Sequence, residues 1–344
     1  MTCHSQLSPR IKSNALILVL SAIAVISGLR KDVGRDYNHY ISIYNYISDP
    51  FINRTREEIG FRLLIKTLYQ LGFNARGLFI VSSIFLSFSL YIFIKNVAPQ
   101  EYWGFFTSLY ICSGLFFSSL NLTRQYIAFS FLLISMIAFY TNRWIASVIL
   151  FILGCTFHKS MMTFLIIIPI YILLKYDVKI GVMATLVISM ILVCTGFNQL
   201  IYIAGQVVPS WKYYSIPNSA TDRNTISIIK AITPTLLFIY AIFQKKDKYY
   251  HYLHDKDNLP ILAGATAYAA CSISFAGIMI LTRITEFFTP LFFLTIIKIV
   301  RQEPSDTKPL LYCIIYIYYM TLCFVTIFIM NGNDVIPYHA SIGL

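Results

Sequence analysis

The sequence predicts an all-α polytopic membrane protein with about eleven transmembrane helices and one interfacial or re-entrant helix. Of its 344 residues, 57% are apolar and only 12% are charged, whereas about a quarter of the residues in soluble domains are charged. The apolar residues fall in repeated runs that are long enough to cross a bilayer. No linker or low-complexity tract interrupts these runs, so residues 1–344 are expected to form a single transmembrane domain.

The first apolar run, residues 14–29, follows a short basic tail and has the position of a signal peptide. No clear small-residue cleavage site follows it, and many further apolar runs do, so we expect an uncleaved anchor. The other spans are expected at residues 77–95, 102–120, 123–140, 144–157, 160–175, 180–203, 226–243, 260–281, 284–299 and 309–330.

A hydrophilic segment, residues 30–76, separates the first two spans and concentrates charged side chains and tyrosines. Asp36 is followed directly by Tyr37 and, one helical turn later, by Tyr40. Tyrosine offers both a ring face and a hydroxyl group, which suits contacts with sugars and with wet interfaces. The segment therefore has the composition of a binding site rather than that of a simple connection.

Residues 59–73 of this segment are amphipathic, with Arg62 and Lys66 among apolar residues, and are too short and too charged to span a bilayer comfortably. We expect them to form the interfacial or re-entrant helix. Glu57 and Glu58 precede it and either belong to a site or cap the helix, since carboxylates are favourable at a helix N-terminus. Gly34 and Gly60 are expected to provide backbone freedom only.

The distribution of lysine and arginine beside short loops predicts how the chain is oriented across the membrane, because cytoplasmic loops carry an excess of both residues. With the N-terminus in the cytoplasm, the inner side holds thirteen such residues and the outer side, apart from the long first loop, holds six. The inner set is Arg10, Lys12, Lys95, Arg143, Lys175, Lys179, Lys245, Lys246, Lys248, Lys256, Lys298, Arg301 and Lys308, and the outer set is Arg124, Lys159, Lys212, Arg223, Lys230 and Arg283. The C-terminus and two loops, residues 30–76 and 204–225, then lie outside. Isolated polar residues also gather at the outer boundary, namely Asp36, Glu58, Arg76, Arg124, His158, Arg223, Arg283, Glu286 and His339.

Several functional classes are excluded by composition and motif. The net charge of +12 comes from basic residues scattered at span ends, so topology explains it and nucleic-acid binding is not expected. The seven cysteines show no paired spacing, which indicates neither a disulfide framework nor a metal cluster. The sequence contains no P-loop, dinucleotide fingerprint, HExxH or GxSxG motif. No DxD-type pair stands out either, so we expect no metal and no other cofactor.

Arginines at the predicted outer ends of spans are candidates for binding an anion. Arg124 opens an apolar run and is followed by Gln125, which favours a buried polar pocket over a simple snorkelling anchor. Arg283 either pairs with Glu286, one helical turn later, or keeps its donors for a ligand. The planar fork of guanidinium N–H groups matches phosphate oxygens. Together with Arg223, these arginines suggest a diphosphate ligand.

Two residues are candidates for acid–base catalysis. His158 lies between two apolar runs and is followed by Lys159 and Ser160, so it is either a satisfied polar group or a proton acceptor near the outer surface. Asp36 is either a solvated loop carboxylate or a base that neighbouring arginines keep ionised and in place. The sequence leaves both alternatives open.

Six motifs occur in the order and spacing of one known family, and together they cover nearly the whole chain. They are Gly34-x-Asp36-Tyr37-x-x-Tyr40, Glu58-x-Gly60-Phe61, Leu122-x-Arg124-Gln125-x-x-Ala128, Phe157-His158-Lys159-Ser160, Arg283-x-x-x-Phe287-Phe288 and Pro337-Tyr338. In these residues the chain resembles the EpsG/Wzy group of bacterial polysaccharide polymerases. It departs from their pattern at Ile59, where the family usually has a proline.

The resemblance implies a GT-C-like fold and a metal-independent glycosyltransferase in the bacterial inner membrane. Such an enzyme joins oligosaccharide units carried on undecaprenyl diphosphate into O-antigen, capsule or exopolysaccharide at the periplasmic face. Its expected partners are the lipid-linked oligosaccharide, the bilayer, and the chain-length regulator and flippase of the same pathway. A flippase or transporter of the same lipid-linked sugar, and an O-antigen ligase, are the alternative functions.

Overall fold

The computed structural model describes residues 8–48, 57–194, 229, 232–233, 235–236, 240, 258–275 and 279–341 of the chain. The regular elements in these residues are helices, and one isolated antiparallel bridge joins Arg30 to Ala340. The chain divides into two compact units, Met1–Met162 with Leu310–Leu344, and Thr163–Pro309, and each is described by itself. The predicted all-helical class is confirmed.

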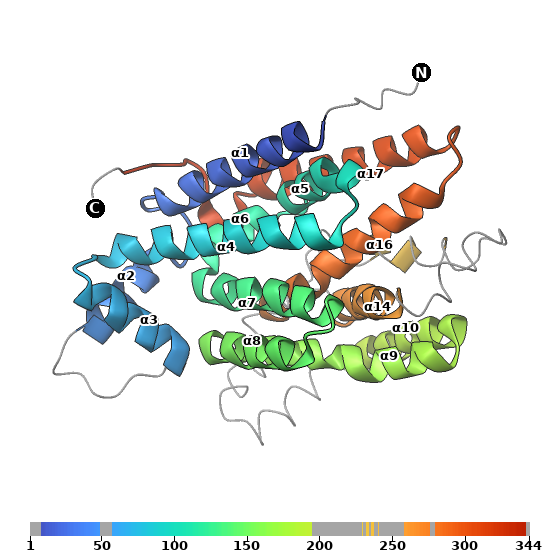
Figure 1. Cartoon of the computed structure of the whole chain (residues 1–344), viewed down its shortest axis with the longest axis horizontal. Coiled ribbons are helices and arrows are strands. Elements are labelled where there is room, and N and C mark those ends of the chain that lie inside the picture. Colours follow the sequence, from blue (N-terminus) through green and yellow to red (C-terminus); the bar gives the residue numbers. More distant parts are fainter. Residues whose placement is uncertain are drawn as a thin grey trace. The chain divides into compact units, whose positions relative to one another are not determined.

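Four helices of the first unit lie side by side in the order α1 (Pro9–Gly28), α4 (Ala75–Val97), α7 (Thr123–Tyr140) and α8 (Trp144–Phe157) (Figure 1). The connection between α7 and α8 is only three residues long, so the two helices run antiparallel. The beginning of α7 therefore lies beside the end of α8. This arrangement brings residues near positions 124 and 158 to the same end of the unit.

The span expected at residues 102–120 is broken into a short 3₁₀ turn, Gln100–Tyr102, and two helices, α5 (Trp103–Cys112) and α6 (Leu115–Asn121), with a bend of 51°. Gly114 stands at the break with a φ of +92°, a left-handed conformation that glycine adopts without steric cost. The break was not predicted. It turns the chain so that α6 ends at Asn121, directly before α7.

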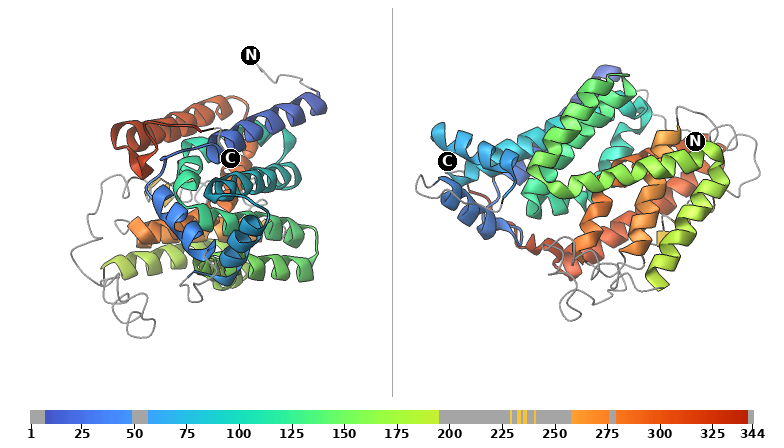
Figure 2. Two further views of the ribbon diagram at one scale, coloured as in Figure 1. Left: turned by 90° about the vertical axis from the view of Figure 1, so that its left-hand side faces the viewer. Right: turned by 90° about the horizontal axis from the view of Figure 1, so that it is seen from below.

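The polar segment between α1 and α4 contains two helices, α2 (Tyr37–Ser48) and α3 (Ile59–Gln70), where sequence analysis expected only the second. Tyr37, Tyr40 and Tyr44 recur at helical spacing, and their buried rings form a core with Phe61 and Phe79. Figure 2 (left) looks onto α2 and α3 of this unit, drawn in blue. Helices α2 and α3 are therefore each held in place by one buried apolar face.

The C-terminal part of the chain returns to the end of α1. Helix α17 (Lys308–Cys323) continues through a π-helical stretch, Phe324–Ile329, and a 3₁₀ turn, Gly332–Asp334. The last described residues then run antiparallel to the segment that follows α1. The backbone N–H of Ser341 donates to the carbonyl of Leu29, and that of Lys31 donates to the carbonyl of His339.

The second unit is built from α9 (Ile167–Tyr176), α10 (Val178–Cys194), α14 (Leu259–Ser274), α15 (Met279–Thr285), a 3₁₀ turn (Glu286–Phe288) and α16 (Thr289–Gln302). Helix α14 packs on α9, α10 and α16 (Figure 2, right). Gly264 permits a close approach to α16, because a Cβ atom there would lie 2.7 Å from the Cβ of Leu291. The span expected at 284–299 begins later, at Thr289.

Five described helices are long and apolar enough to cross a membrane, or six if the bent pair is one span. They are Pro9–Gly28, Ala75–Val97, Thr123–Tyr140, Lys159–Tyr176 and Lys308–Ile329, and three shorter apolar helices are Trp144–Phe157, Val178–Leu192 and Leu259–Ser274. Most of the span expected at 226–243 and the loop 204–225 lie outside the described residues. The chain is thus a multi-pass membrane protein, and the number eleven stays a prediction.

Candidate functional site

Glu58 lies at the centre of a polar cluster at one end of the first unit. It is the N-cap residue of α3, as one of the two alternatives expected, although its side chain makes no capping hydrogen bond. Its carboxylate accepts hydrogen bonds from Nη1 of Arg124 at 2.9 Å and from the backbone N–H of Lys159 at 3.4 Å. Nδ1 of His158 lies 3.8 Å from the same carboxylate. One acid thus contacts residues that are 66 and 101 positions away in sequence.

Three helix ends supply these residues. Arg124 lies in the first turn of α7, and His158 directly follows the last residue of α8. The antiparallel α7–α8 pair places these two ends together, and α3 packs against α8. Arg124 and His158, which sequence analysis assigned to separate roles, are therefore gathered around Glu58.

Gly60 allows α3 to approach α8 closely. A Cβ atom at this position would collide with the hydroxyl of Thr156 and would lie 3.0 Å from ring atoms of Phe157. The expectation that Gly60 provides only backbone freedom is therefore wrong, because it lies inside a regular helix and is needed for its lack of volume. Gly34 does have a positive φ, +97°, and a Cβ there would also lie 2.6 Å from the carbonyl oxygen of Leu120.

The cluster is partly shielded from solvent and contains a paired arginine and glutamate. The side chains of Arg124 and Glu58 are 26% and 12% exposed, so their ion pair is screened less than a surface pair. Nε of Arg124 is buried and has no hydrogen-bond acceptor among the described residues. The beginning of α7 adds the positive end of a helix dipole beside the guanidinium. The start of α7 and the Arg124 guanidinium are therefore candidates for binding an anion.

Tyr40 and Tyr37 support the cluster from α2. The hydroxyl of Tyr40 accepts a hydrogen bond from the backbone N–H of Arg124 at 3.2 Å. The ring of Tyr37 stacks on Phe79 at a centroid distance of 4.8 Å, and burial raises the pKa of its hydroxyl. Both rings are buried, so these tyrosines shape the site through packing and through the Tyr40 hydroxyl rather than by offering open ring faces.

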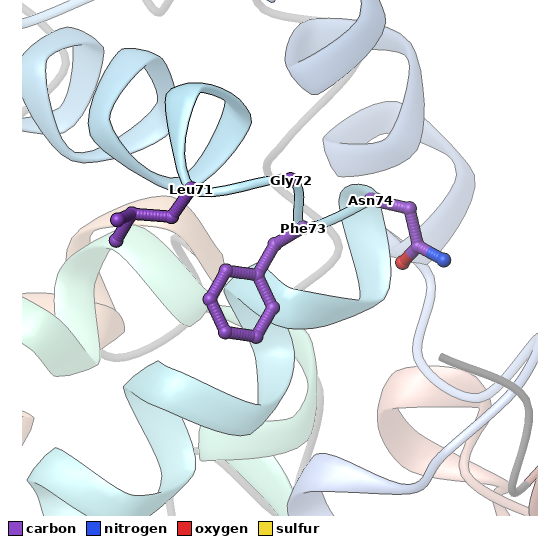
Figure 3. A pocket seen from close by; sticks show the side chains of 4 residues that line it. All are labelled: Leu71, Gly72, Phe73 and Asn74. Atoms are coloured by element: carbon purple, nitrogen blue, oxygen red, sulfur yellow. The ribbon is translucent and has the colours of Figure 1, made fainter.

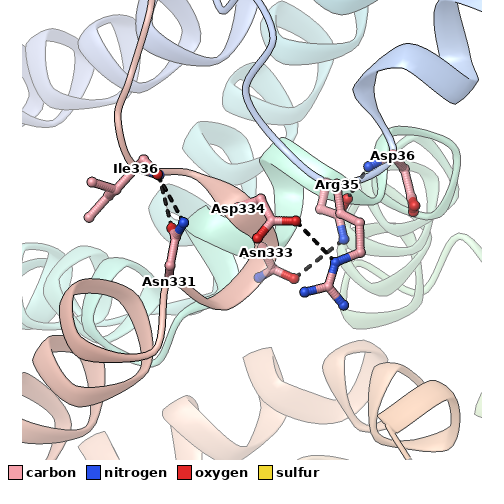
Figure 4. A network of polar contacts seen from close by, with 7 residues as sticks. Arg35, Asp36, Asn331, Asn333, Asp334 and Ile336 are labelled. Atoms are coloured by element: carbon pink, nitrogen blue, oxygen red, sulfur yellow. Dashed lines mark hydrogen bonds and ion pairs between the residues drawn. The ribbon is translucent and has the colours of Figure 1, made fainter.

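Asp36 belongs to a second polar network beside the first (Figure 4). Its backbone N–H donates to Oδ1 of Asn121 at 2.8 Å, and Nδ2 of Asn121 donates to Oδ1 of Asn333 at 3.3 Å. Arg35 pairs with Asp334 at 3.2 Å, but both side chains are about half exposed, so this pair adds little stability. The half-buried carboxylate of Asp36 has no hydrogen-bond or ion-pair partner in the described part of the chain. It remains available to a ligand.

The other predicted site residues are placed as follows. Gln125 is buried in α7, next to Arg124. Arg283 is half-buried in the last turn of α15, with Glu286 opening the following 3₁₀ turn, and both belong to the second unit. Arg223 lies outside the described residues.

Sequence reasoning missed several residues of the two networks. Asn121, Asn333 and Arg30 have side-chain contacts around Asp36 and the start of α7. Asn121 stands before a helix start, which was a usable signal, whereas a buried Arg30 looks in sequence like an ordinary flanking charge.

A small hollow at the α3–α4 turn is lined by Leu71, Gly72, Phe73 and Asn74 (Figure 3) and contains no titratable side chain. Among the described residues, no three His, Cys, Asp or Glu side chains form a group that could hold a metal ion.

Comparison with known proteins identifies one family. The profile described as the EpsG family matches residues 14–340, nearly the entire chain. No curated protein and no solved structure matches the chain. The matched range includes both polar networks of the first unit and the Arg283 region of the second.

The close approach at Gly60 yields a prediction about the assembly of the cluster. Replacing Gly60 with alanine adds a Cβ against Thr156 and Phe157, and such overpacking costs about 1–3 kcal/mol. This exceeds the gain of at most ~1 kcal/mol in helix propensity. Gly60→Ala is therefore expected to lower the melting temperature of the purified protein in detergent. The added change Thr156→Ala removes the nearest colliding atom and is expected to restore part of the loss, and an unchanged melting temperature for Gly60→Ala would contradict the packing.

Proposed function

The chain belongs to the EpsG family of Wzy-type polysaccharide polymerases, and from this membership we propose that it joins oligosaccharide units carried on undecaprenyl diphosphate. In the proposed step, the bond between the anomeric carbon of the growing chain and its diphosphate oxygen breaks. A glycosidic bond forms to a hydroxyl oxygen of the incoming lipid-linked unit. The hydroxyl proton passes to a protein base, and undecaprenyl diphosphate leaves with the electron pair.

The observation that supports this proposal most strongly is the convergence of Arg124 and His158 on the carboxylate of Glu58. A diphosphate leaving group gains negative charge as the bond breaks, so positive charge held in place lowers the barrier. Arg124 can supply this charge, because its side chain is 26% exposed and the positive end of the α7 dipole lies beside it. Since arginine supplies the charge, the proposed transfer requires no metal ion.

Glu58 keeps the catalytic groups in position. Its contact with Arg124 fixes the guanidinium before substrate arrives, which reduces the reorganisation required in the transition state. Its proximity to His158 stabilises the imidazolium that would form after proton uptake. We therefore favour His158 as the base. Asp36, a half-buried carboxylate with no partner in the described residues, is the alternative base.

The remaining expected site residues take supporting roles in this proposal. Arg283 and Arg223 would bind phosphate oxygens of the donor or acceptor lipid, and Gln125 would hold the backbone of the site near Arg124. The enzyme would lie in the bacterial inner membrane with a cytoplasmic N-terminus and a periplasmic C-terminus. Its product would be O-antigen or a related surface polysaccharide, made together with a chain-length regulator and a flippase.

A flippase is a weaker interpretation of the same site. It would need polar or charged groups along a path that opens to both membrane faces. In α4 no charged residue lies between Arg76 and Lys95, and in α7 none follows Arg124. The serines at 82 and 89 in α4 donate to carbonyls of their own helix. Charge concentrated at one end favours chemistry at one surface over passage across the membrane.

The role of the arginines is tested by polymerisation of lipid-linked repeat units with purified protein. Arg124→Ala is expected to lower kcat about 100-fold or more, because loss of one donor that stabilises developing charge costs roughly 10²–10³. Arg283→Ala is expected to act in the same direction. Arg143→Ala, at the opposite end of α7, serves as the control and should leave the rate unchanged. Normal polymerisation by both Arg124→Ala and Arg283→Ala would show that the assigned roles are wrong.

The choice of base is tested by the pH dependence of the rate. Removing a general base typically costs roughly 10²–10⁴ in rate and abolishes the fall in rate at acid pH that protonation of this base causes. We expect His158→Gln to show both effects and Asp36→Asn to retain the acid limb of the profile. If Asp36→Asn loses the acid limb and His158→Gln keeps it, the aspartate is the base.

A further inference from the structure

Arg30, which the proposed chemistry does not use, is a buried cation close to the site. It follows the end of α1 and is only 3% exposed. One terminal nitrogen donates to the carbonyl of Ser27, and the other donates to Oγ1 of Thr123 at 2.9 Å. Its Nε is buried without an acceptor, and no carboxylate pairs with it, among the residues that the structure describes. A guanidinium in such surroundings requires a physical explanation.

Burying an unpaired charge carries a large desolvation penalty even after relaxation of the surroundings. Two contacts offset part of this cost. The Ser27 carbonyl lies in the last turn of α1, at the negative end of the helix dipole, and the guanidinium lies 4.2 Å from the centre of the Phe79 ring. Burial lowers the pKa of Arg30 to about 10, so the group stays protonated at neutral pH. An apolar side chain would avoid the penalty altogether, so stability alone does not explain an arginine here.

The contacts of Arg30 show what it holds together. Thr123 is the first residue of α7 and directly precedes Arg124. Two further hydrogen bonds join the segment that follows α1 to the residues around the start of α7. They run from the N–H of Asp36 to Asn121 and from the N–H of Arg124 to the Tyr40 hydroxyl. The Arg30 side chain also contacts α1, through the Ser27 carbonyl, and α4, through the Phe79 ring, which the rings of Tyr37 and Tyr40 contact as well. Arg30 therefore connects the segment that carries Asp36 and Tyr40 to three helices at once.

We propose that Arg30 is a positioning residue that fixes the first turn of α7 against the segment 30–40, so that Arg124 keeps a set distance and direction from the acid–base groups. This inference rests on the proposed function. Arg30 itself touches no substrate, because it is only 3% exposed. Its effect is on alignment, and a misplacement of about 1 Å can cost as much as 10²-fold in rate.

The test is a double-mutant cycle on polymerisation kinetics. Arg30→Lys keeps the charge but lacks the planar fork that reaches Ser27 and Thr123 together. Thr123→Val removes only the acceptor and is the milder variant should the lysine protein fold poorly. Each single change is expected to lower kcat about tenfold or more, with KM for the lipid-linked substrate nearly unchanged, since the binding groups themselves remain. The double variant should be no slower than the slower single variant, because both changes break one contact.

The controls separate positioning from general stability. Lys95→Gln, at the opposite end of α4, should leave kcat unchanged, and kcat is expressed per folded protein as measured by size-exclusion chromatography. An unchanged kcat in both single variants, or effects that multiply in the double variant, would overturn the role of Arg30. Failure of the unaltered protein to polymerise lipid-linked units would instead overturn the proposed function.

Discussion

The candidate site depends on the contacts that the Glu58 carboxylate makes with residues of three helix ends. It holds the guanidinium of Arg124, accepts the backbone N–H of Lys159 and lies beside the imidazole of His158. These contacts exist only if the beginnings of α3 and α7 lie beside the end of α8. The short α7–α8 turn and the missing side chain of Gly60 make this possible. In partly dehydrated surroundings the loss of one partner would leave a poorly compensated charge, so the three groups act as one unit.

A second layer of polar contacts surrounds this cluster and explains why the polar segment after α1 is folded rather than a simple connection. Asn121 binds the backbone of Asp36, Tyr40 binds the backbone of Arg124, and Arg30 joins α1 to the start of α7. The C-terminal residues pair with the same segment through Ser341. Donors and acceptors at the ends of these helices thus satisfy one another, whereas the half-buried Asp36 carboxylate has no partner among the described residues.

The sequence was sufficient to predict the helical class, most of the apolar runs and the family, because each follows from local periodicity or from motif order. It also singled out Glu58, Arg124 and His158, since charged residues beside apolar runs are costly and stand out. It could not predict the buried position of Arg30 or the close contact at Gly60, because both depend on side chains more than 90 positions away. The break at Gly114 was missed because a single glycine within an apolar run is common in transmembrane helices and does not by itself mark a bend.

The proposed position of a diphosphate-binding cluster at the outer membrane surface is tested most directly by cysteine labelling at position 159. The side chain of Lys159 is exposed beside the Glu58 cluster, and Lys159→Cys is introduced after the native cysteines are replaced. We predict that a membrane-impermeant maleimide labels this cysteine in spheroplasts and that added undecaprenyl diphosphate slows the labelling. Labelling that occurs only in inverted vesicles, or at a rate that the lipid diphosphate does not change, would contradict the account.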